Sequence, residues 1–328
     1  MSDLGELTAR PELDSALDRY RTELTGYCYR MLGSSFDAED AVQDTYIRAW
    51  RSYDKFEGRA SLRSWLYRIA TNVCLDLLNA GNKRARPMDL TAPQAQASAV
   101  LNQRPEVTWL EPVPDGRVLP QTADPAEMAL AKESVRLAFV AALQHLPAKQ
   151  RAVLILREVL AWKADEVAEL LDTTVASVNS ALQRARATMA AHPPRDSSPA
   201  DPLDADQAEL LKRYLTAFET YDISSLTALL HEDAVLSMPP FDLWLQGQAD
   251  IAAWHLNQGI GCKGSRLVPT TANGLPAFGQ YRLAEDGSGH TPWALQVLEI
   301  SDGRIVGLNA FLDTARWFPL FGLPERLA

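Results

Sequence analysis

The sequence has few cysteines, no long apolar run and no excess of positive charge. Its three cysteines, Cys28, Cys74 and Cys262, are far apart, which excludes the close spacing of a cysteine metal site. We interpret them as small buried hydrophobic side chains rather than redox sensors. Neither a signal peptide nor a run of about 18 apolar residues is present. We therefore expect a cytoplasmic protein, and the sequence suggests no metal and no cofactor.

The charge balance limits the ways in which the chain can meet nucleic acid. A formal net charge of −10 argues against broad nonspecific DNA binding by the free protein. Local basic patches remain compatible with DNA binding, and the acidic surface either gives solubility or keeps the free protein off DNA. The 47% hydrophobic and 23% charged residues are ordinary for a globular protein. A length of 328 residues predicts two or three structural units.

The stretch from Val159 to Met189 carries the most informative pattern. It predicts two short helices joined at 172–174, where Asp172 tolerates left-handed backbone geometry and Thr174 can cap the second helix. That helix has an apolar stripe at spacings of three and four, typical of a buried face. Its other face carries Ser177, Asn179, Ser180, Gln183, Arg184 and Arg186, which suit the major groove of DNA. The pattern favours a DNA-binding helix-turn-helix, although an ordinary helical hairpin would also show it.

Two further helices are predicted upstream. In the first, over 37–50, Asp37 stands at the expected N-cap, and Ile47 lies among polar side chains outside the apolar face. An exposed Ile in such surroundings suggests a protein partner. A turn through 54–61 leads into the second helix, which begins at Leu62. Its apolar residues point one way and leave Arg63, Arg68, Thr71 and Asn72 for another surface.

Three motifs in this order resemble the extracytoplasmic-function (ECF) sigma factors of bacterial RNA polymerase. They are AEDAVQDTYIRAW from Ala38, FEGRASLRSWLYRIATNVCLD from Phe56, and LPAKQRAVLILREVL from Leu146, directly before the helix-turn-helix. The resemblance covers residues 13–191 with a gap in the middle. It implies two all-α domains, a region 2 helical bundle and a region 4 helix-turn-helix, that bind core RNA polymerase and promoter DNA.

The family's residue roles carry over by position. The 37–51 helix matches the surface that binds the clamp helices of the polymerase β′ subunit, and the resemblance also implies contact with the β flap. The 56–61 loop and the helix after it match the element that melts and reads the −10 sequence by holding an extruded base. The helix from Val175 matches the −35 reader. The candidates are Asp40, Gln43, Asp44, Ile47 and Arg48 for core polymerase; Gly58, Arg59, Ala60, Ser61, Arg63, Arg68 and Asn72 for the −10 element; and Thr174, Ser177, Asn179, Ser180, Gln183, Arg184 and Arg186 for the −35 element.

Some positions depart from the usual family pattern. Lys163 stands where Ser often begins the first helix of the turn motif, Asp172 replaces a common Gly, and Asn179 replaces a common Lys. These changes prevent transfer of a promoter sequence and leave the fold assignment intact. The wording VNSALQRAR, from Val178, is similar to a subgroup whose members carry an extra C-terminal domain.

Between residues 81 and 125 the helical periodicity disappears. A basic start is followed by Ala, Gln and scattered Pro, which predicts an extended and weakly structured linker. By resemblance, this segment runs through the polymerase near its active-site and RNA-exit channels. The island WLEPVPDGRVLP, residues 109–120, is too specific for a plain spacer. We expect Trp109, Leu110 and Val113 to anchor it on a surface, and Glu111 and Asp115 to mimic nucleic-acid charge.

After a second linker, rich in Pro, Asp and Ser, the pattern changes. Two helices are expected around 210–218 and 223–230, then a strand, then a helix over Gln248–Gln258. Four segments rich in β-formers follow, with a strong hairpin signal at Ser301-Asp302-Gly303. Helices followed by an antiparallel sheet predict an α+β cone. The four segments are Ser265–Ala272, Ala277–Ala284, Thr291–Ile300 and Arg304–Leu312.

This tail resembles the SnoaL-like branch of the nuclear-transport-factor-2-like (NTF2-like) superfamily. The matching residues are AFETYDISSLTALLHEDAVLSMPP from Ala217, GQADIAAW from Gly247 and the final hairpin. The resemblance implies an apolar pocket, which in some relatives is an isomerase or cyclase site and in others only binds. The candidate pocket residues are His231, Asp233, Asp242, Trp244, Trp254 and His255. Each also has a structural reading, and no spacing among them demands catalysis, so we expect no enzymatic activity.

Together these patterns predict an ECF sigma factor with a fused regulatory domain. The expected units are region 2 at 10–80, a linker at 81–125, region 4 at 126–191, a linker at 192–205 and the cone at 206–328. Two alternatives stay open: a one-component, ligand-responsive helix-turn-helix regulator, and a sigma factor tethered to an active isomerase-like cone. A small-molecule ligand of the cone and an anti-sigma partner are also left open.

Overall fold

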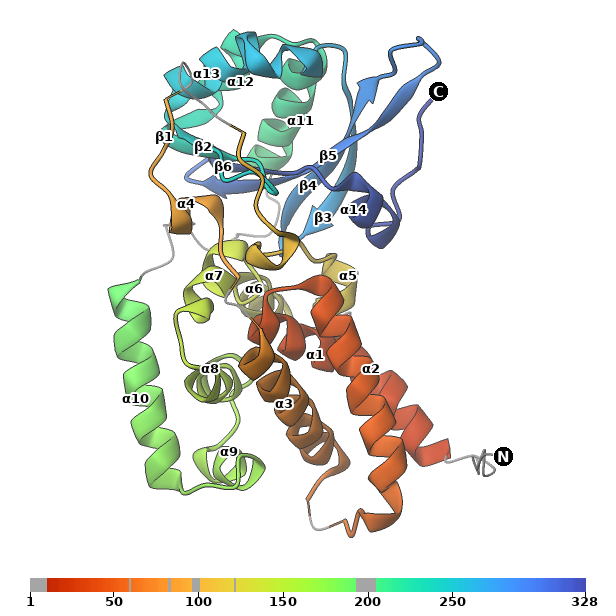
Figure 1. The fold of residues 1–328 in the computed structure, drawn as a ribbon, viewed down its shortest axis with the longest axis vertical. Coiled ribbons are helices and arrows are strands. Elements are labelled where there is room, and N and C mark those ends of the chain that lie inside the picture. Colours follow the sequence, from red (N-terminus) through yellow and green to blue (C-terminus); the bar gives the residue numbers. More distant parts are fainter. Residues whose placement is uncertain (1–10, 59, 82–83, 96–100, 121, 193–204) are drawn as a thin grey trace.

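The computed structural model has a helical half and a sheet half (Figure 1). The described parts of the linker, within residues 84–120, pack between these two halves. It describes residues 11–58, 60–81, 84–95, 101–120, 122–192 and 205–328. None of the described helices is long and apolar enough to span a membrane. The helical half has the elements of both sigma-like regions, and the sheet half has those of the expected cone.

The first helical unit packs three helices around a core that includes Leu24, Tyr27, Leu66 and Val73. The sequence placed the N-cap of its second helix at Asp37, and this prediction is wrong. Ser34 is the N-cap, and its side chain accepts a hydrogen bond from the backbone N–H of Asp37. The elements are α1 (Pro11–Leu32), α2 (Ser35–Ser52), the 3-10 turn η1 (Tyr53–Lys55) and α3 (Leu62–Ala80).

The second helical unit contains the predicted helix-turn-helix. Thr174 caps α10 by accepting from the N–H of Ser177, and Asp172 has the expected left-handed geometry with φ of 50°. Val178, Leu182 and Ala185 form the buried stripe. The elements are α6 (Pro125–Glu133), α7 (Leu137–Gln144), α8 (Ala148–Leu154), the π-helical turn η4 (Ile155–Val159), α9 (Ala164–Leu170) and α10 (Val175–Ala191).

The segment between these units is not the weakly structured linker that its composition predicts. Trp109, Leu110, Glu111 and Val113 are each at most 4% exposed, because the island is packed between the helical half and the sheet. The predicted anchoring by the three apolar residues is confirmed, with this chain's own domains as the surface. The short elements here are α4 (Pro87–Leu90), η3 (Glu106–Thr108) and α5 (Asp115–Val118).

The C-terminal part of the chain, residues 205–328, forms a separate unit that we call the cone domain. Its six strands lie in the order β2-β1-β6-β5-β4-β3, with only β1 and β6 parallel. Along β5, side chains alternate between the two faces: Gln296 and Leu298 face the domain's own helices, whereas Leu295 and Val297 join the core of the helical half. The sheet is therefore covered on both faces. The strands are β1 (Leu230–Ser237), β2 (Trp244–Gln246), β3 (Arg266–Ala272), β4 (Leu275–Leu283), β5 (His290–Ser301) and β6 (Arg304–Phe311).

The helices of the cone domain cover one face of its sheet (Figure 1). They are α11 (Ala205–Glu219), α12 (Ile223–Ala228), α13 (Gln248–Leu256) and the 3-10 turn η5 (Gln258–Cys262); α14 (Thr314–Leu320) packs near β5. The four predicted β segments and the 301–303 turn are confirmed. The sequence did not predict β2, which has three residues, or α14. All three cysteines are buried and free, as expected.

Candidate functional site

The residues predicted to bind core polymerase share one exposed face of α2. Positions 40, 43, 44, 47 and 48 repeat at helical spacing, and all five side chains are exposed. Ile47 is 47% exposed, and Arg48 pairs with Asp76 of α3 at 3.1 Å. An apolar residue ringed by charged and amide groups fits the centre of a small protein interface.

Some of the predicted −10 residues have exposed side chains, and others form hydrogen bonds within this chain. Gly58 has φ of 68° in the loop before α3, and Ser61 caps α3 by accepting from the N–H of Ser64. Arg68 and Asn72 are exposed on α3, Ala60 is half-buried, and Arg59 lies outside the described residues. Arg63 is not free, because its Nε donates to Glu23 at 2.6 Å.

Arg63 also takes part in a direct contact between the two helical units. Its guanidinium lies 5.0 Å from the ring centroid of Trp162, which precedes α9. The rings of Tyr67 and Trp162 have centroids 4.9 Å apart. Arg151 of α8 donates to the carbonyl of Met31 in α1 and to Gln144. A residue expected to touch promoter DNA thus contacts region 4, although its side chain stays 37% exposed.

We expect Trp162→Ala to loosen this contact, because truncating a buried aromatic side chain costs about 3–5 kcal/mol. Amide hydrogen exchange should quicken in α3 and α9 and stay unchanged in β5 of the cone domain. Trp162→Phe, which keeps a ring against Tyr67, is the matched control. Unchanged exchange in α9 of the alanine variant would contradict the role given to Trp162.

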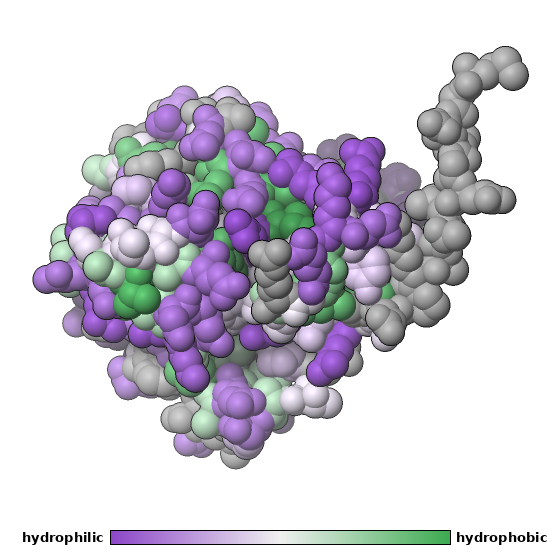
Figure 2. All heavy atoms as spheres, turned by 90° about the horizontal axis from the view of Figure 1, so that it is seen from below, coloured by the Kyte–Doolittle hydropathy of each residue, from purple (hydrophilic) through white to green (hydrophobic). Residues whose placement is uncertain are grey.

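The predicted −35 residues lie at the N-cap of α10 and on the parts of this helix outside its buried stripe. All seven of them are exposed, from Thr174 at the cap to Arg186. Arg184 donates to Ser180 at 2.7 Å, and Arg186 pairs with Glu158 at 2.5 Å. These are weak surface contacts that DNA phosphates can replace. Figure 2 views the lower end of the molecule in Figure 1, where hydrophilic side chains cover most of the surface and hydrophobic ones show in separate patches.

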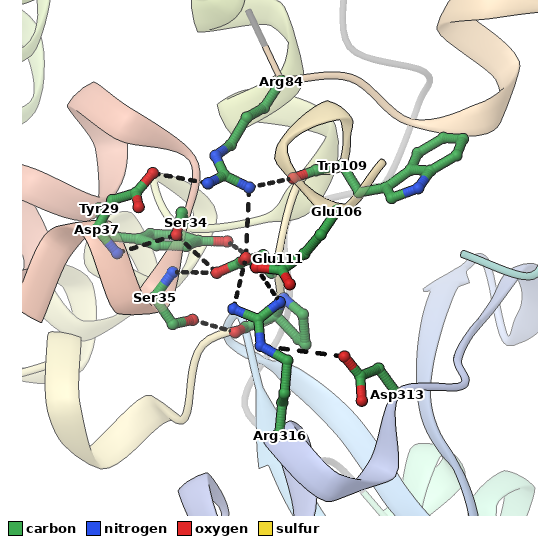
Figure 3. A network of polar contacts seen from close by, with 11 residues as sticks. Tyr29, Ser34, Ser35, Asp37, Arg84, Glu106, Trp109, Glu111, Asp313 and Arg316 are labelled. Carbon is green, nitrogen blue, oxygen red and sulfur yellow. Dashed lines mark hydrogen bonds and ion pairs between the residues drawn. The ribbon is translucent and has the colours of Figure 1, made fainter. Parts of the chain in front are cut away.

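Glu111 of the linker is the centre of a buried polar network (Figure 3). Its carboxylate accepts from Ser34 Oγ at 2.6 Å and from the N–H of Ser35 at 3.0 Å, both at the start of α2. It also pairs with Arg84 at 3.3 Å and with Arg316 of α14 at 3.2 Å. One side chain therefore joins region 2, the linker and the cone domain. This internal pairing does not fit the predicted role of Glu111 as a mimic of nucleic-acid charge.

A second joint is the tip of the β3–β4 hairpin, Asn273-Gly274. Asn273 has φ of 57° and no exposed surface. Its Nδ2 donates to Tyr29 Oη of α1 at 2.6 Å and to the carbonyl of Val135 at 2.8 Å, and its Oδ1 accepts from the N–H of Val113 at 3.1 Å. The tip is thus bonded to region 2, to the start of region 4 and to the linker.

Gly274 allows this close approach, because a Cβ there would lie 2.8 Å from Lys132 Cβ and Lys132 O. Its N–H donates to Asp115 Oδ1 at 2.7 Å. Burial raises the pKa of Asp115, and the hydrogen bond from Gly274 opposes that shift. Asp115 is therefore also held inside the chain rather than offered to a partner. The dipeptide Asn-Gly is a strong turn signal that the sequence interpretation did not use.

The cone domain encloses a cavity of about 270 Å³ between its helices and its sheet. Two of the predicted pocket residues, Trp254 and His255 of α13, line it. Burial lowers the pKa of His255 to about 4, so its imidazole is neutral at pH 7. The lining also includes Leu101, Phe218, Phe241, Gln280, Arg282, Trp293 and Gln296.

The placement of the other four predicted pocket residues was wrong. His231 and Asp233 lie at an irregularity in β1, between Leu230 and Val235, and their side chains face a separate depression with Glu299 and Asp302. Trp244 donates from Nε1 to the carbonyl of Thr91 at 2.9 Å, so it faces the linker. Asp242 pairs with Arg104, also of the linker, at 3.2 Å.

Comparison with protein families identifies the class to which each of the three units belongs. Residues 16–84 match Sigma-70 region 2, residues 136–189 match Sigma-70, region 4, and residues 211–308 match the SnoaL-like domain. The two helical units and the cone domain are thus sigma-70 regions followed by a SnoaL-like domain.

Individual relatives then narrow the assignment. The chain is 46% identical to the ECF RNA polymerase sigma factor SigG of Mycobacterium tuberculosis, over 97% of this chain and 85% of that protein. It is 30% identical to SigJ of the same organism, over 68% of this chain and 64% of that protein. The crystal structure of SigJ covers 95% of this chain and is itself 99% covered, with a TM-score of 0.60 at 21% identity, which supports the whole fold. The chain belongs to the ECF sigma factor family.

Membership in this family gives the activity. The protein directs RNA polymerase to promoters, with region 2 and region 4 as its promoter-binding parts. This excludes the reading as a one-component repressor or activator that works without polymerase. The sequence interpretation missed Trp162, Asn273 and Arg316, which connect the parts. Trp162 and Arg316 carry no local signal, since each contacts a residue more than 90 positions away, whereas Asn273 begins the Asn-Gly turn signal.

Proposed function

We propose that the cone domain holds the free sigma factor in a closed form that cannot read a whole promoter. The contacts of Asn273 carry this proposal, because one buried side chain bonds region 2, the linker and the start of region 4. Glu111 adds a second bond between region 2 and the cone domain. The cone domain then acts as a built-in inhibitor in place of a separate anti-sigma protein.

The geometry of promoters supports this reading. The −35 and −10 elements are roughly 25 base pairs apart, about 85 Å at 3.4 Å per base pair. In the closed form, regions 2 and 4 touch through Tyr67 and Trp162. Two small domains in contact cannot reach both elements at once, so they must separate before the sigma factor engages a promoter.

Core polymerase is the partner that we expect to open the closed form. The exposed face of α2 is available for the β′ clamp helices, and region 4 is expected to reach the β flap once released. The −10 contacts would come from the 58–61 loop, Arg63, Arg68 and Asn72, with Arg63 freed from Trp162. The −35 contacts would come from residues 174–186 of α10, whose polar side chains are already exposed.

The cone domain is proposed to bind rather than to catalyse. The polar groups that line its cavity include amides, one neutral imidazole and one arginine. Proton abstraction needs a base with a pKa near the working pH, and the lowered pKa of His255 does not meet that need. We call the hold of the cone domain on regions 2 and 4 the clamp, and we expect a small-molecule ligand to regulate it.

We expect Ile47→Glu to weaken binding to core polymerase by tenfold or more, a loss of about 1.4 kcal/mol. The new carboxylate would be desolvated beside Asp44 in the interface. Equilibrium binding of labelled protein to purified core polymerase measures this. Leu283→Glu, at an exposed apolar position of β4 that is 56% exposed, is the control and should leave binding unchanged. Equal affinities of the two variants for core polymerase would show that α2 is not part of the interface.

The clamp itself is tested by in vitro transcription with core polymerase. The intact chain is compared with a chain ending at residue 199, on the DNA upstream of its own gene, because sigma factors often drive their own genes. Core binding is measured in parallel to show that both proteins are competent. We expect more transcript from the shortened chain. Equal or smaller amounts would show that the cone domain does not inhibit.

A further inference from the structure

The cavity of the cone domain has walls suited to a flat apolar molecule. Aromatic rings of Phe218, Phe241, Trp254 and Trp293 contribute to its lining. Its volume of about 270 Å³ is close to the lower end of small-molecule sites, about 300–1,000 Å³. A ligand with a single ring and a short polar substituent fits this space better than a drug-sized compound.

The polar groups of the cavity select for an anion. Among the described residues that line it, Arg282 is the only charged one, and none is Asp or Glu. The guanidinium of Arg282 stacks on Trp293 at 3.2 Å from the ring centroid, which holds it in place, and its buried Nε has no hydrogen-bond partner. His255 is 5% exposed, and its Nδ1 also lacks a partner. Buried polar atoms of this kind are normally satisfied, and a carboxylate would pair with the fixed guanidinium.

The linker contributes part of the cavity wall. The side chain of Leu101 lines the cavity and is 46% exposed. The residues after it are bonded to the loop after β1: the N–H of Asp242 donates to the Asn102 carbonyl and the N–H of Arg104 donates to the Pro240 carbonyl, both at 3.0 Å. Phe241 of that loop lines the cavity as well. A ligand that reaches the Leu101 side of the cavity therefore touches the linker segment that leads to Glu111.

We propose that this cavity binds a small aromatic monocarboxylate, with its carboxylate on Arg282 and its ring among the aromatic walls, and that binding loosens residues 101–104 of the linker. The second part rests on the proposed clamp and supplies it with a chemical signal. The first part stands on the cavity alone.

Phenylacetate is the probe, and its uncharged analogue phenylacetamide is the matched ligand control. Titration calorimetry with the full chain should show saturable binding of phenylacetate and at least tenfold weaker binding of the amide. Arg282→Gln should lose tenfold or more, and Arg282→Lys should lose less. Arg266→Gln, at an exposed arginine of β3 outside the cavity, should bind as the parent does. Equal binding of acid and amide, equal binding by Arg282→Gln, or no saturable binding at millimolar concentration would each overturn the site.

Amide hydrogen exchange tests the link to the linker. Saturating phenylacetate should quicken exchange of the N–H groups of Arg104 and Asp242, which bridge the linker and the 238–242 loop. Unchanged exchange despite binding would overturn the link and leave the site standing. Neither experiment contains polymerase, so a failure here is distinct from a failure of the transcription test of the clamp.

Discussion

Replacing Asn273 with glycine is expected to release the cone domain from the helical half while leaving both folded. Glycine tolerates the φ of 57°, so the change removes hydrogen bonds without adding backbone strain. Tyr29 Oη, the N–H of Val113 and the Val135 carbonyl each lose a partner. Leaving a buried polar group unpaired costs about 1–3 kcal/mol. Because Tyr29 Oη still donates to the Glu111 carbonyl at 2.7 Å, the loss falls on the Val113 N–H and the Val135 carbonyl, and it weakens the interface between the cone domain and the helical half.

Small-angle X-ray scattering and limited proteolysis measure this release. The variant should have a larger radius of gyration, and the 109–120 island should be cleaved faster. Asp302→Gly is the matched control, since Asp302 also has a left-handed backbone, φ 48°, but lies in the exposed turn of the β5–β6 hairpin. A variant at Asn273 as compact and as resistant as the control would show that this side chain does not hold the domains together.

Replacing Glu111 with alanine is expected to have the largest effect on stability. The carboxylate is 1% exposed and faces Arg84, which is 7% exposed, and Arg316. Removing one member of a buried ion pair costs roughly 3–5 kcal/mol when the remaining charge is left unpaired. Arg84 keeps Asp37 and Arg316 keeps Glu106, so we expect a loss near the lower end of this range. The N–H of Ser35 and the hydroxyl of Ser34 also lose their acceptor. We expect the first thermal unfolding transition to fall by several degrees.

The control for Glu111 is Glu106→Ala. Glu106 also pairs with Arg316, but its side chain is 57% exposed, and exposed pairs contribute about 0–1 kcal/mol. Differential scanning calorimetry of both variants separates a buried joint from a surface contact. Similar transition temperatures for the two variants would mean that water reaches Glu111 in solution and that the network does not hold the closed form.

The sequence predicted the parts of this protein better than their connections. The helix-turn-helix, the exposed face of α2 and the four long strands follow from local periodicity and capping, which act within a few residues. Glu111 has no such signal, because its partner Arg316 lies 205 positions away. A carboxylate in a proline-rich segment therefore suggested a solvated linker, and only the fold reveals its burial.

The cavity shows a second limit of sequence interpretation. His231 and Asp233 are polar residues within an expected strand, and polar residues near a predicted pocket are natural candidates for its lining. Together with Val235 they lie on the face of the sheet opposite Leu236, which lines the cavity, because successive side chains of a strand point to opposite faces. Arg282, on the other hand, belongs to a strand that the sequence predicted, but its direction into the cavity depends on register.

The closed form is tested most directly by measuring the distance between regions 2 and 4 in solution. Spin labels at Asp18→Cys on α1 and Ala190→Cys on α10 would be exposed, while the three native thiols are buried. We expect one narrow distance distribution in the free chain and a longer distance after core polymerase is added. Asn273→Gly should shift toward the longer distance without polymerase. A free chain that already shows the polymerase-bound distance would contradict the clamp.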